Sequence, residues 1–158
     1  MKSIYFAGGC FWGVEEYFSK VAGVIETEVG YANGKIENPT YEDVCHNFTG
    51  HAETVKVSYD ERLASVETLL AALFRIIDPT LLNRQGPDRG AQYRTGVYSE
   101  NEDDLAAANE WIGSVAGKYK KPVQTEVLPL ENYSRAEEYH QKYLKKNSGG
   151  YCHIDLDA

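Results

Sequence analysis

Apolar and polar positions alternate with two periods along the chain, one typical of strands and the other of helices. Every second side chain from Ile25 to Tyr31 shares one face, which is the period of a half-buried strand. After Gly13 the apolar side chains recur at the i, i+3, i+4, i+7 spacing of an amphipathic helix. The strands predicted in this way are residues 4–7, 24–31, 51–59, 93–98 and 123–128. The predicted helices are residues 14–21, 66–77, 99–119 and 134–144, with one further helical turn at 41–45.

Start and stop signals accompany the later helices. Ser65 is the expected N-cap of the helix at 66–77, which Asp78-Pro79 ends because the residue before a proline avoids helical backbone. Two capping boxes are expected, Ser99 with Glu102 and Ser134 with Glu137. Between Pro79 and Ala91 lies a long polar loop, of a kind that is more often functional than idle.

The order of the elements predicts one α+β domain over residues 1–158. The economical architecture is a two-layer α/β sandwich, a ferredoxin-like mixed sheet with helices packed on one side. No internal repeat, linker or second domain boundary interrupts the pattern. The glycine-rich residues 147–158 predict a long, irregular and flexible C-terminal tail, which carries Cys152.

Cys10 lies where the first strand turns into the first helix, between paired glycines and two large aromatic residues. The free amides and the dipole of a helix N-terminus favour the thiolate, which is the nucleophilic form of cysteine. The alternative is a buried structural cysteine, since free cysteine is among the most buried residue types. The stretch alone leaves both readings open.

Glu53 falls on the apolar face of its strand, in phase with Val55, Val57 and Tyr59. A carboxyl group that loses hydration has a raised pKa, and can then donate a proton near neutral pH. The alternative is that Glu53 lies at the strand end and simply reaches water.

Composition excludes several classes of partner. The chain of 158 residues has a net charge of −8 and lacks a large basic cluster, which argues against nucleic acid and anionic membranes. No apolar run has the length of a membrane span, and no signal segment opens the chain, so we expect a cytoplasmic protein. The three cysteines are too few and too scattered for a disulfide framework.

The histidines give weak evidence for a metal site. Cys45, His46 and His51 lie close together, and Cys152-His153 could add ligands, but this spacing lacks a second cysteine pair. We therefore expect surface histidines, with His140 on the exposed side of its helix. A nucleotide-binding loop of the Walker or GxGxxG type is also missing from the sequence.

Two cysteines and an acid suggest a redox cycle. A thiolate that attacks an oxygen-bearing atom ends as sulfenic acid, which a second thiol converts to a disulfide. Cys10, Cys152 and Glu53 can supply the attacking thiol, the resolving thiol and the proton donor.

Four signatures, in order, resemble the A-type peptide methionine sulfoxide reductases, and the likeness covers nearly the whole chain. They are Gly9-Cys10-Phe11-Trp12-Gly13, Gly50-His51-Ala52-Glu53, Asn83-Arg84-Gln85-Gly86-Pro87-Asp88-Arg89-Gly90-Ala91-Gln92-Tyr93-Arg94 and Gly150-Tyr151-Cys152. The resemblance implies reduction of the S epimer of methionine sulfoxide, free or in proteins, to methionine.

The resemblance also implies roles for single residues. Cys10 matches the nucleophile that attacks the sulfoxide sulfur, Glu53 the acid that protonates the oxygen, and Cys152 the resolving cysteine. Phe11 and Trp12 match the aromatics that hold the substrate methyl group. The remaining matches are Tyr41 and Tyr93, which hydrogen-bond the sulfoxide oxygen, and Asp88, a carboxylate that supports the site.

The implied reductant is thioredoxin, or dithiothreitol in a tube, and no bound cofactor or metal is expected. We expect a monomer and leave Cys45 as structural; some relatives are fused to a B-type reductase, and residues 1–158 contain no such domain. Two other functions stay open: a thiol peroxidase, and a non-enzymatic module that binds oxidised methionine.

Overall fold

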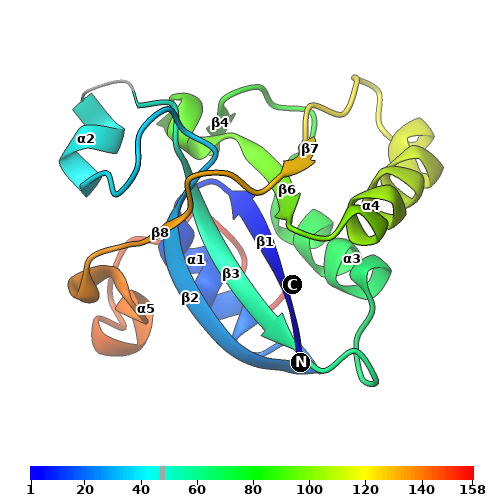
Figure 1. The fold of residues 1–158 in the computed structure, drawn as a ribbon, viewed down its shortest axis with the longest axis horizontal. Coiled ribbons are helices and arrows are strands. Elements are labelled where there is room, and N and C mark those ends of the chain that lie inside the picture. Colours follow the sequence, from blue (N-terminus) through cyan, green and yellow to red (C-terminus); the bar gives the residue numbers. More distant parts are fainter. Residues whose placement is uncertain (47–48) are drawn as a thin grey trace.

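The computed structural model describes residues 1–46 and 49–158. In this part of the chain a sheet of six strands runs in the order β7-β6-β1-β3-β2-β8. Strands β6 and β7 are parallel, and the other neighbours are antiparallel, so the sheet is mixed. The predicted α+β fold class is confirmed (Figure 1).

The elements have the following bounds. The sheet contains β1 (Lys2–Gly8), β2 (Val24–Ala32), β3 (Ala52–Tyr59), β6 (Thr95–Ser99), β7 (Glu126–Pro129) and β8 (Ser134–Arg135). The α-helices are α1 (Phe11–Phe18), α2 (Tyr41–His46), α3 (Val66–Ile76), α4 (Glu102–Val115) and α5 (Tyr143–Lys146). A small hairpin of β4 (Arg84–Gln85) and β5 (Asp88–Arg89) lies in the long polar loop, and the 3-10 turns are η1 (Ala91–Tyr93), η2 (Ala116–Lys118) and η3 (Glu138–His140).

Both faces of the sheet are covered, but by different kinds of structure. Helices α1 and α3 supply Val14, Phe18 and Leu73 to a core shared with Phe6 and Val57 of the central strands. The opposite face carries a smaller apolar cluster, which the irregular segment at 130–133 covers. Its members are Tyr5, Ala7, Ala32, Ala52 and Tyr98, with Leu130 and Tyr133 packed on them. The main hydrophobic core therefore lies between the sheet and its helices, behind the sheet in Figure 1.

The predicted phase of β3 is confirmed. Val55, Val57 and Tyr59 belong to the main core, and Glu53 is 1% exposed. The alternative in which Glu53 reaches water at the strand end is therefore wrong. In β2 a bulge between Val24 and Glu26 interrupts the alternation, which leaves Ile25 exposed rather than facing the core as predicted.

One of the three predicted helix starts is confirmed. Ser65 caps α3 in a reciprocal box with Thr68, whose amide donates to the Ser65 Oγ atom at 3.2 Å. The box of Ser99 with Glu102 is wrong, because Ser99 still pairs with Pro129 in the sheet. Asn101 caps α4 instead.

The helix predicted over residues 134–144 is wrong. Ser134 and Arg135 form the edge strand β8, which pairs with β2, and beyond the 3-10 turn η3 the chain becomes α-helical only at α5. Glu137 does not close a capping box: its carboxylate accepts hydrogen bonds from the Tyr31 hydroxyl at 2.7 Å and the Tyr41 amide at 2.9 Å. Bonds to distant strands thus replace the intrahelical bonds that the apolar spacing predicted. His140 lies in this segment and is 1% exposed, so its predicted exposure is also wrong.

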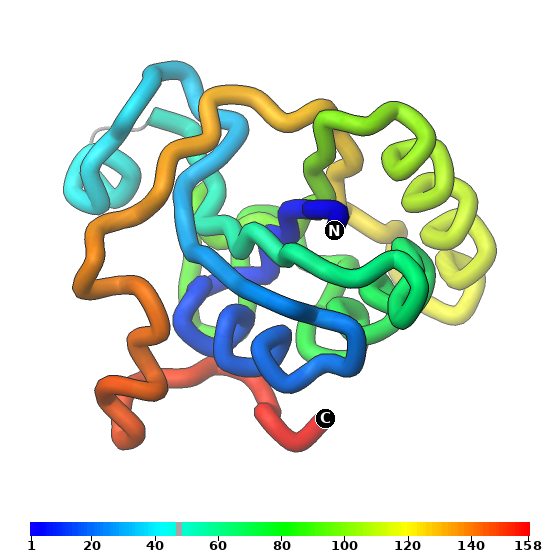
Figure 2. The backbone as a smooth tube through the Cα atoms, turned by 60° about the horizontal axis from the view of Figure 1, so that its bottom comes forward, coloured from blue at the N-terminus to red at the C-terminus, as the bar shows by residue number. Residues whose placement is uncertain are grey.

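The C-terminal tail runs beside α1, where Figure 2 shows the red end of the chain along the blue helix. Ile154 and Leu156 pack against the main core, and the Tyr17 hydroxyl donates to the Ala158 carbonyl at 3.2 Å. The His153 ring nitrogen Nε2 lies 3.0 Å from the Gly8 carbonyl oxygen. These contacts fix the course of the tail in the structure, and its predicted flexibility stays a prediction.

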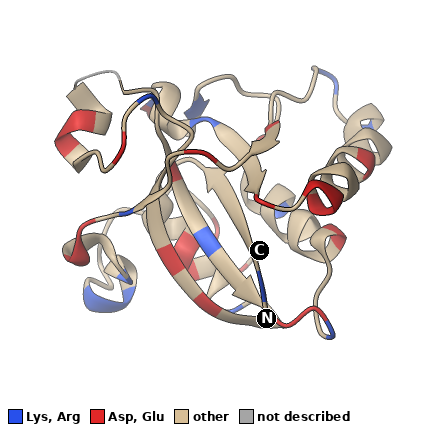
Figure 3. Cartoon of the chain, viewed as in Figure 1, with Lys and Arg blue, Asp and Glu red and all other residues tan. Residues whose placement is uncertain are grey.

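Acidic residues are spread over several elements rather than gathered at one point (Figure 3). They occupy the first turns of α2 and α4, while Lys145 and Lys146 lie in the last turn of α5. Across residues 1–46 and 49–158, no helix is long and apolar enough to span a membrane.

Candidate active site

Cys10 is the N-cap residue of α1 and lies two residues after the last residue of β1, at the strand-to-helix turn that the pattern predicts. The turn depends on Gly9, whose φ of 88° is strained for a residue with a side chain. A Cβ atom on Gly9 would also lie 2.8 Å from side-chain atoms of Gln85 and His153. Close packing at this glycine therefore fixes the direction in which Cys10 points.

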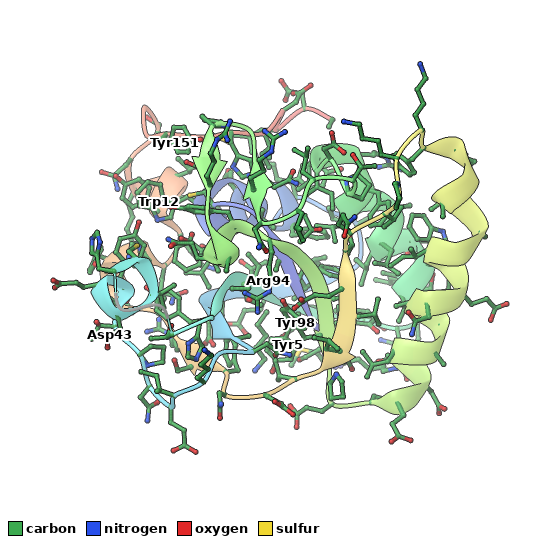
Figure 4. All side chains as sticks on the ribbon, turned by 90° about the horizontal axis from the view of Figure 1, so that it is seen from above. Tyr5, Trp12, Asp43, Arg94, Tyr98 and Tyr151 are labelled. Atoms are coloured by element: carbon green, nitrogen blue, oxygen red, sulfur yellow. The ribbon has the colours of Figure 1, made fainter. Side chains whose placement is uncertain are left out.

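A cavity of about 200 Å³ opens at this turn. It joins the start of α1 to α2, to β3 and to the polar loop that carries the β4–β5 hairpin. Its lining contains seven of the predicted site residues and one further tyrosine: Cys10, Phe11, Trp12, Tyr41, Glu53, Asp88, Tyr93 and Tyr151. Trp12 and Tyr151 lie on the same side of the molecule in Figure 4. The fold thus brings distant sequence segments to one small site.

Glu53 is buried in the lining of the cavity, with an N–H group close to each of its carboxyl oxygens. Its Oε1 atom accepts the Phe11 amide at 3.2 Å, and its Oε2 atom lies 3.3 Å from the Gln92 side-chain amide. Burial raises the pKa of Glu53 to about 8, although both hydrogen bonds act in the opposite direction. The carboxyl group is therefore mostly protonated at neutral pH.

The protonation state of Cys10 differs from the thiolate that its position at a helix start predicts. Burial, followed by the nearby Glu53 carboxylate, raises the pKa of the Cys10 thiol well above its ordinary value. The nearby backbone amide of Trp12 lowers this pKa, as expected at a helix start, but its effect is smaller. The expectation of a thiolate in the free protein is therefore wrong, because a residue only 8% exposed loses more hydration than the helix end returns.

Tyr41 and Tyr93 line the cavity and keep their hydroxyl groups protonated. Burial is the main cause that raises the pKa of each phenol; the hydrogen bond to Cys45 comes next for Tyr41, and the Glu53 carboxylate adds to the shift of both. At neutral pH both groups remain hydrogen-bond donors, which is what an oxygen atom bound in the cavity requires.

Trp12 forms an apolar wall of the cavity. Its indole stacks on Tyr143 with the ring centroids 3.8 Å apart and the planes 9° apart. The indole Nε1 atom donates a hydrogen bond to the Nδ1 atom of His140 at 3.0 Å. Phe11, which is 1% exposed, completes the aromatic lining beside it.

Cys152 lies outside the cavity lining, against the first turn of α1. A Cβ atom on Gly13 would lie 2.8 Å from the Cys152 sulfur, so this glycine makes room for the tail. The thiol donates to the Ile154 carbonyl at 3.4 Å. Both Cys10 and Cys152 are free thiols at the same end of α1.

Two residues of the site, Tyr151 and Gln92, were not predicted from the sequence. Tyr151 lines the cavity and donates to the Asp88 carboxylate at 2.8 Å, which joins the tail to the β4–β5 hairpin. Gln92 links Glu53 to Cys45, whose sulfur lies 3.1 Å from the Gln92 side-chain nitrogen. Both Tyr151 and Gln92 lie inside the signatures quoted above, but their partners depend on tertiary contacts.

The weak metal cluster is not assembled as a site. His46 is exposed, whereas His51 is 1% exposed and bonds through Nδ1 to the Thr49 hydroxyl at 2.9 Å. The expectation of surface histidines is therefore wrong for His51. Among the residues that the structure describes, no three His, Cys, Asp or Glu side chains are arranged to hold a metal ion.

A buried thiol, a protonated carboxyl group and two phenol donors around an aromatic cavity define a thiol-dependent oxidoreductase. A family model described as peptide methionine sulfoxide reductase matches residues 2–158. The chain is 58% identical over 157 residues to the peptide methionine sulfoxide reductase MsrA of Clostridium botulinum strain Hall, covering 99% of this chain and 100% of that protein. The chain belongs to the peptide methionine sulfoxide reductase family and is a methionine sulfoxide reductase.

Solved structures agree with this assignment. The crystal structure of Mxr1 from Saccharomyces cerevisiae in reduced form has a TM-score of 0.92 at 38% identity, covering 96% of this chain and 88% of that one. A structure of Mxr1 in complex with Trx2 has a TM-score of 0.66 at 25% identity, covering 98% and 88%.

Proposed function

We propose that this reductase acts on the S epimer of methionine sulfoxide, free and in proteins, with Cys10 as its nucleophile. The observation that carries the proposal is the buried, protonated Glu53 in the same small cavity as the Cys10 thiol. A sulfoxide needs both groups, because its oxygen leaves sulfur only as a proton reaches it.

The first half of the cycle removes one oxygen atom from the substrate. The Cys10 sulfur attacks the sulfoxide sulfur while Glu53 gives its proton to the oxygen. The thiol proton passes to Glu53, which gives it to the oxygen as the sulfur–oxygen bond breaks and water leaves, so the two sulfurs stay joined as a sulfonium. Water then attacks the Cys10 sulfur and the sulfur–sulfur bond breaks, which releases methionine, leaves the sulfenic acid of Cys10 and returns a proton to Glu53. Cys10 is oxidised by two electrons and the substrate is reduced by two.

The lining of the cavity orients the substrate in three directions. Phe11 and Trp12 receive the methyl group, Tyr41 and Tyr93 donate to the oxygen, and the rest of the methionine points out of the cavity. Three fixed directions around a chiral sulfur distinguish its two epimers, since the wrong epimer must exchange two of the groups. The Asp88 carboxylate supports the wall through its bond from Tyr151.

The second half of the cycle restores the thiol. Cys152 attacks the sulfenic sulfur, releases water and forms a disulfide with Cys10, which a thioredoxin dithiol then reduces. The complex of yeast Mxr1 with Trx2 supports a thioredoxin as the partner. We propose that the enzyme binds no cofactor and acts as a monomer in the cytoplasm, where its three unpaired cysteines suit a reducing environment.

The decisive assay offers the S and R epimers of methionine sulfoxide separately with dithiothreitol and follows methionine formed. We expect turnover of the S epimer, and a rate with the R epimer that is lower by about 10²-fold or more. Equal turnover of both epimers, or turnover of neither, contradicts the proposal. Fast consumption of peroxide would instead favour the thiol peroxidase, and binding without turnover the non-enzymatic module.

Cys152→Ser separates the two halves of the cycle. Under a weak reductant the variant is expected to form about one methionine per enzyme and to stop with Cys10 as sulfenic acid, because the oxygen transfer uses Cys10 and Glu53 but not the Cys152 thiol. Mass spectrometry after trapping with dimedone measures the sulfenic acid. Sustained turnover with thioredoxin in this variant would remove Cys152 from the cycle.

A further inference from the structure

Trp12 is held in place from two sides. Tyr143 stacks on one face of its indole at 3.8 Å between centroids, and His140 accepts the indole N–H at 3.0 Å. The indole surface left free by these two neighbours lines the cavity at Cys10. The direction of the cavity wall therefore depends on two residues of the segment between β8 and the tail.

His140 is held in a fixed orientation. It is 1% exposed and lies between aromatic rings, with centroids at 4.7 Å from Tyr41, 5.2 Å from Phe11 and 4.1 Å from Tyr139. Because Nδ1 accepts the bond from Trp12, the proton of the neutral ring is on Nε2. The Nε2 atom is buried and finds no hydrogen-bond partner among the described residues.

The Nε2 atom of His140, buried without a hydrogen-bond partner among the described residues, is unfavourable for folding. A buried polar group without a partner costs about 1–3 kcal/mol, so an apolar side chain would pack here more favourably. The cost is offset only on the other side of the ring, where Nδ1 binds Trp12. The residue type at this position is therefore explained by its bond to the cavity wall and not by core packing.

The backbone around His140 is anchored on both sides. The Gln141 side chain accepts from the Val29 amide at 2.9 Å and donates to the Val29 carbonyl at 2.8 Å, as a strand residue would. Lys142 adopts a left-handed conformation with a φ of 52°, and its amide donates to the buried Glu15 carboxylate at 2.6 Å. This bend lets both His140 and Tyr143 reach the same indole, and such strain persists only where the surroundings hold it.

We propose that His140 is a positioning residue that fixes the Trp12 indole through the Nδ1 hydrogen bond and so sets the selectivity of the cavity for a methyl group. The inference rests on the proposed function, in which Trp12 receives the methyl group of the sulfoxide. A fixed indole excludes a longer alkyl group, whereas an indole free to rotate admits it and binds the methyl group less well.

The test compares His140→Leu with His140→Asn. Leucine removes the acceptor, whereas the Asn carbonyl oxygen takes the place of Nδ1 and restores it. For the S epimer of methionine sulfoxide we expect His140→Leu to raise KM about tenfold, the loss of one hydrogen bond, with kcat within about threefold of the parent enzyme. The preference for the methyl sulfoxide over its ethyl homologue, S-ethionine sulfoxide, should fall roughly threefold or more in this variant, and His140→Asn should recover both values.

Fluorescence gives a readout that does not depend on turnover. In a Trp111→Phe background, Trp12 is the remaining tryptophan, and its emission should shift to the red in His140→Leu but not in His140→Asn. His46→Leu, which removes an exposed histidine of α2, is the matched control and should change neither KM nor emission. An unchanged KM, selectivity and emission in His140→Leu overturns the proposal, as does an equal defect in a folded His140→Asn.

A measurement on the unmodified enzyme covers the case in which His140→Leu does not fold. Nitrogen-15 spectra of the imidazole rings should show His140 as the neutral tautomer with its proton on Nε2 and Nδ1 as an acceptor. A proton on Nδ1 overturns the inference. An enzyme that ignores S-methionine sulfoxide yet shows this tautomer would instead contradict the proposed function alone.

Discussion

Glu53→Gln is expected to lower kcat/KM for S-methionine sulfoxide by on the order of 10² or more, the usual contribution of a positioned general acid. The amide side chain would keep the shape of the glutamate and the acceptor for the Phe11 amide, but it has no proton that a carboxyl pKa of about 8 makes available. The loss should fall on kcat more than on KM, since the proton moves only as the sulfur–oxygen bond breaks. Steady-state kinetics with dithiothreitol measure both constants, and near-normal activity would leave Glu53 without a chemical role.

The same substitution is expected to stabilise the fold. The unfolded Glu53 loses its proton near its ordinary pKa of 4.5, whereas the folded protein holds the proton up to about 8. Between these values the folded state binds more protons, so its stability falls as the pH rises. At pH 7 the neutral amide should recover about 3 kcal/mol, and the gain should shrink toward pH 4.5.

Thermal or urea unfolding across pH 4.5 to 8 measures this second effect. Glu67→Gln, at an exposed position of α3, is the matched control and should leave both the stability curve and the activity nearly unchanged. A variant at Glu53 that is slower but equally stable at pH 7 would show that the carboxyl group is better hydrated than its 1% exposure implies. If Glu53→Gln lowers kcat/KM and raises the free energy of unfolding, Glu53 destabilises the fold and serves the reaction.

Local patterns predicted much of this site, because its central residues lie on regular elements. The period of two placed Glu53 on the core face of β3, and the change of rhythm after Gly13 placed Cys10 at a strand-to-helix turn. The segment at 134–144 was predicted as a helix because its apolar spacing is helical, but bonds to Val29 and Glu15 decide its path. Those partners are more than 100 residues away, and no local pattern contains them.

The prediction of a thiolate at Cys10 is wrong for a related reason. A helix start favours an anion by about 0.3–1 kcal/mol, whereas full burial can shift a pKa by several units, each worth about 1.4 kcal/mol. The helix start can be predicted from the sequence, whereas the burial of Cys10 depends on tertiary contacts. Burial raises the pKa of both Cys10 and Glu53, so we expect an enzyme that holds two protons at rest, both of which the proposed mechanism gives to the sulfoxide oxygen.

Cys10→Ser is expected to abolish methionine formation, with a loss of on the order of 10⁴ or more, as when other enzymes lose their nucleophile. Serine fits the volume of the buried thiol, so the fold and the aromatic cavity should persist. The variant should still bind S-methionine sulfoxide, which calorimetric titration measures. Binding that disappears with the thiol would show that Cys10 shapes the cavity as well as reacting in it.

Cys152→Ser is the natural comparison for this variant. Cys152 lies against Gly13 rather than in the cavity, so its loss should spare the first oxygen transfer and leave about one methionine per enzyme, whereas Cys10→Ser should leave none. A stoichiometric burst from Cys10→Ser would mean that another group attacks the sulfoxide sulfur, and Cys45, linked to Glu53 through Gln92, would be the first to test. The burst size, rather than the steady-state rate, therefore assigns the nucleophile, because it counts oxygen atoms transferred before any resolving thiol is needed.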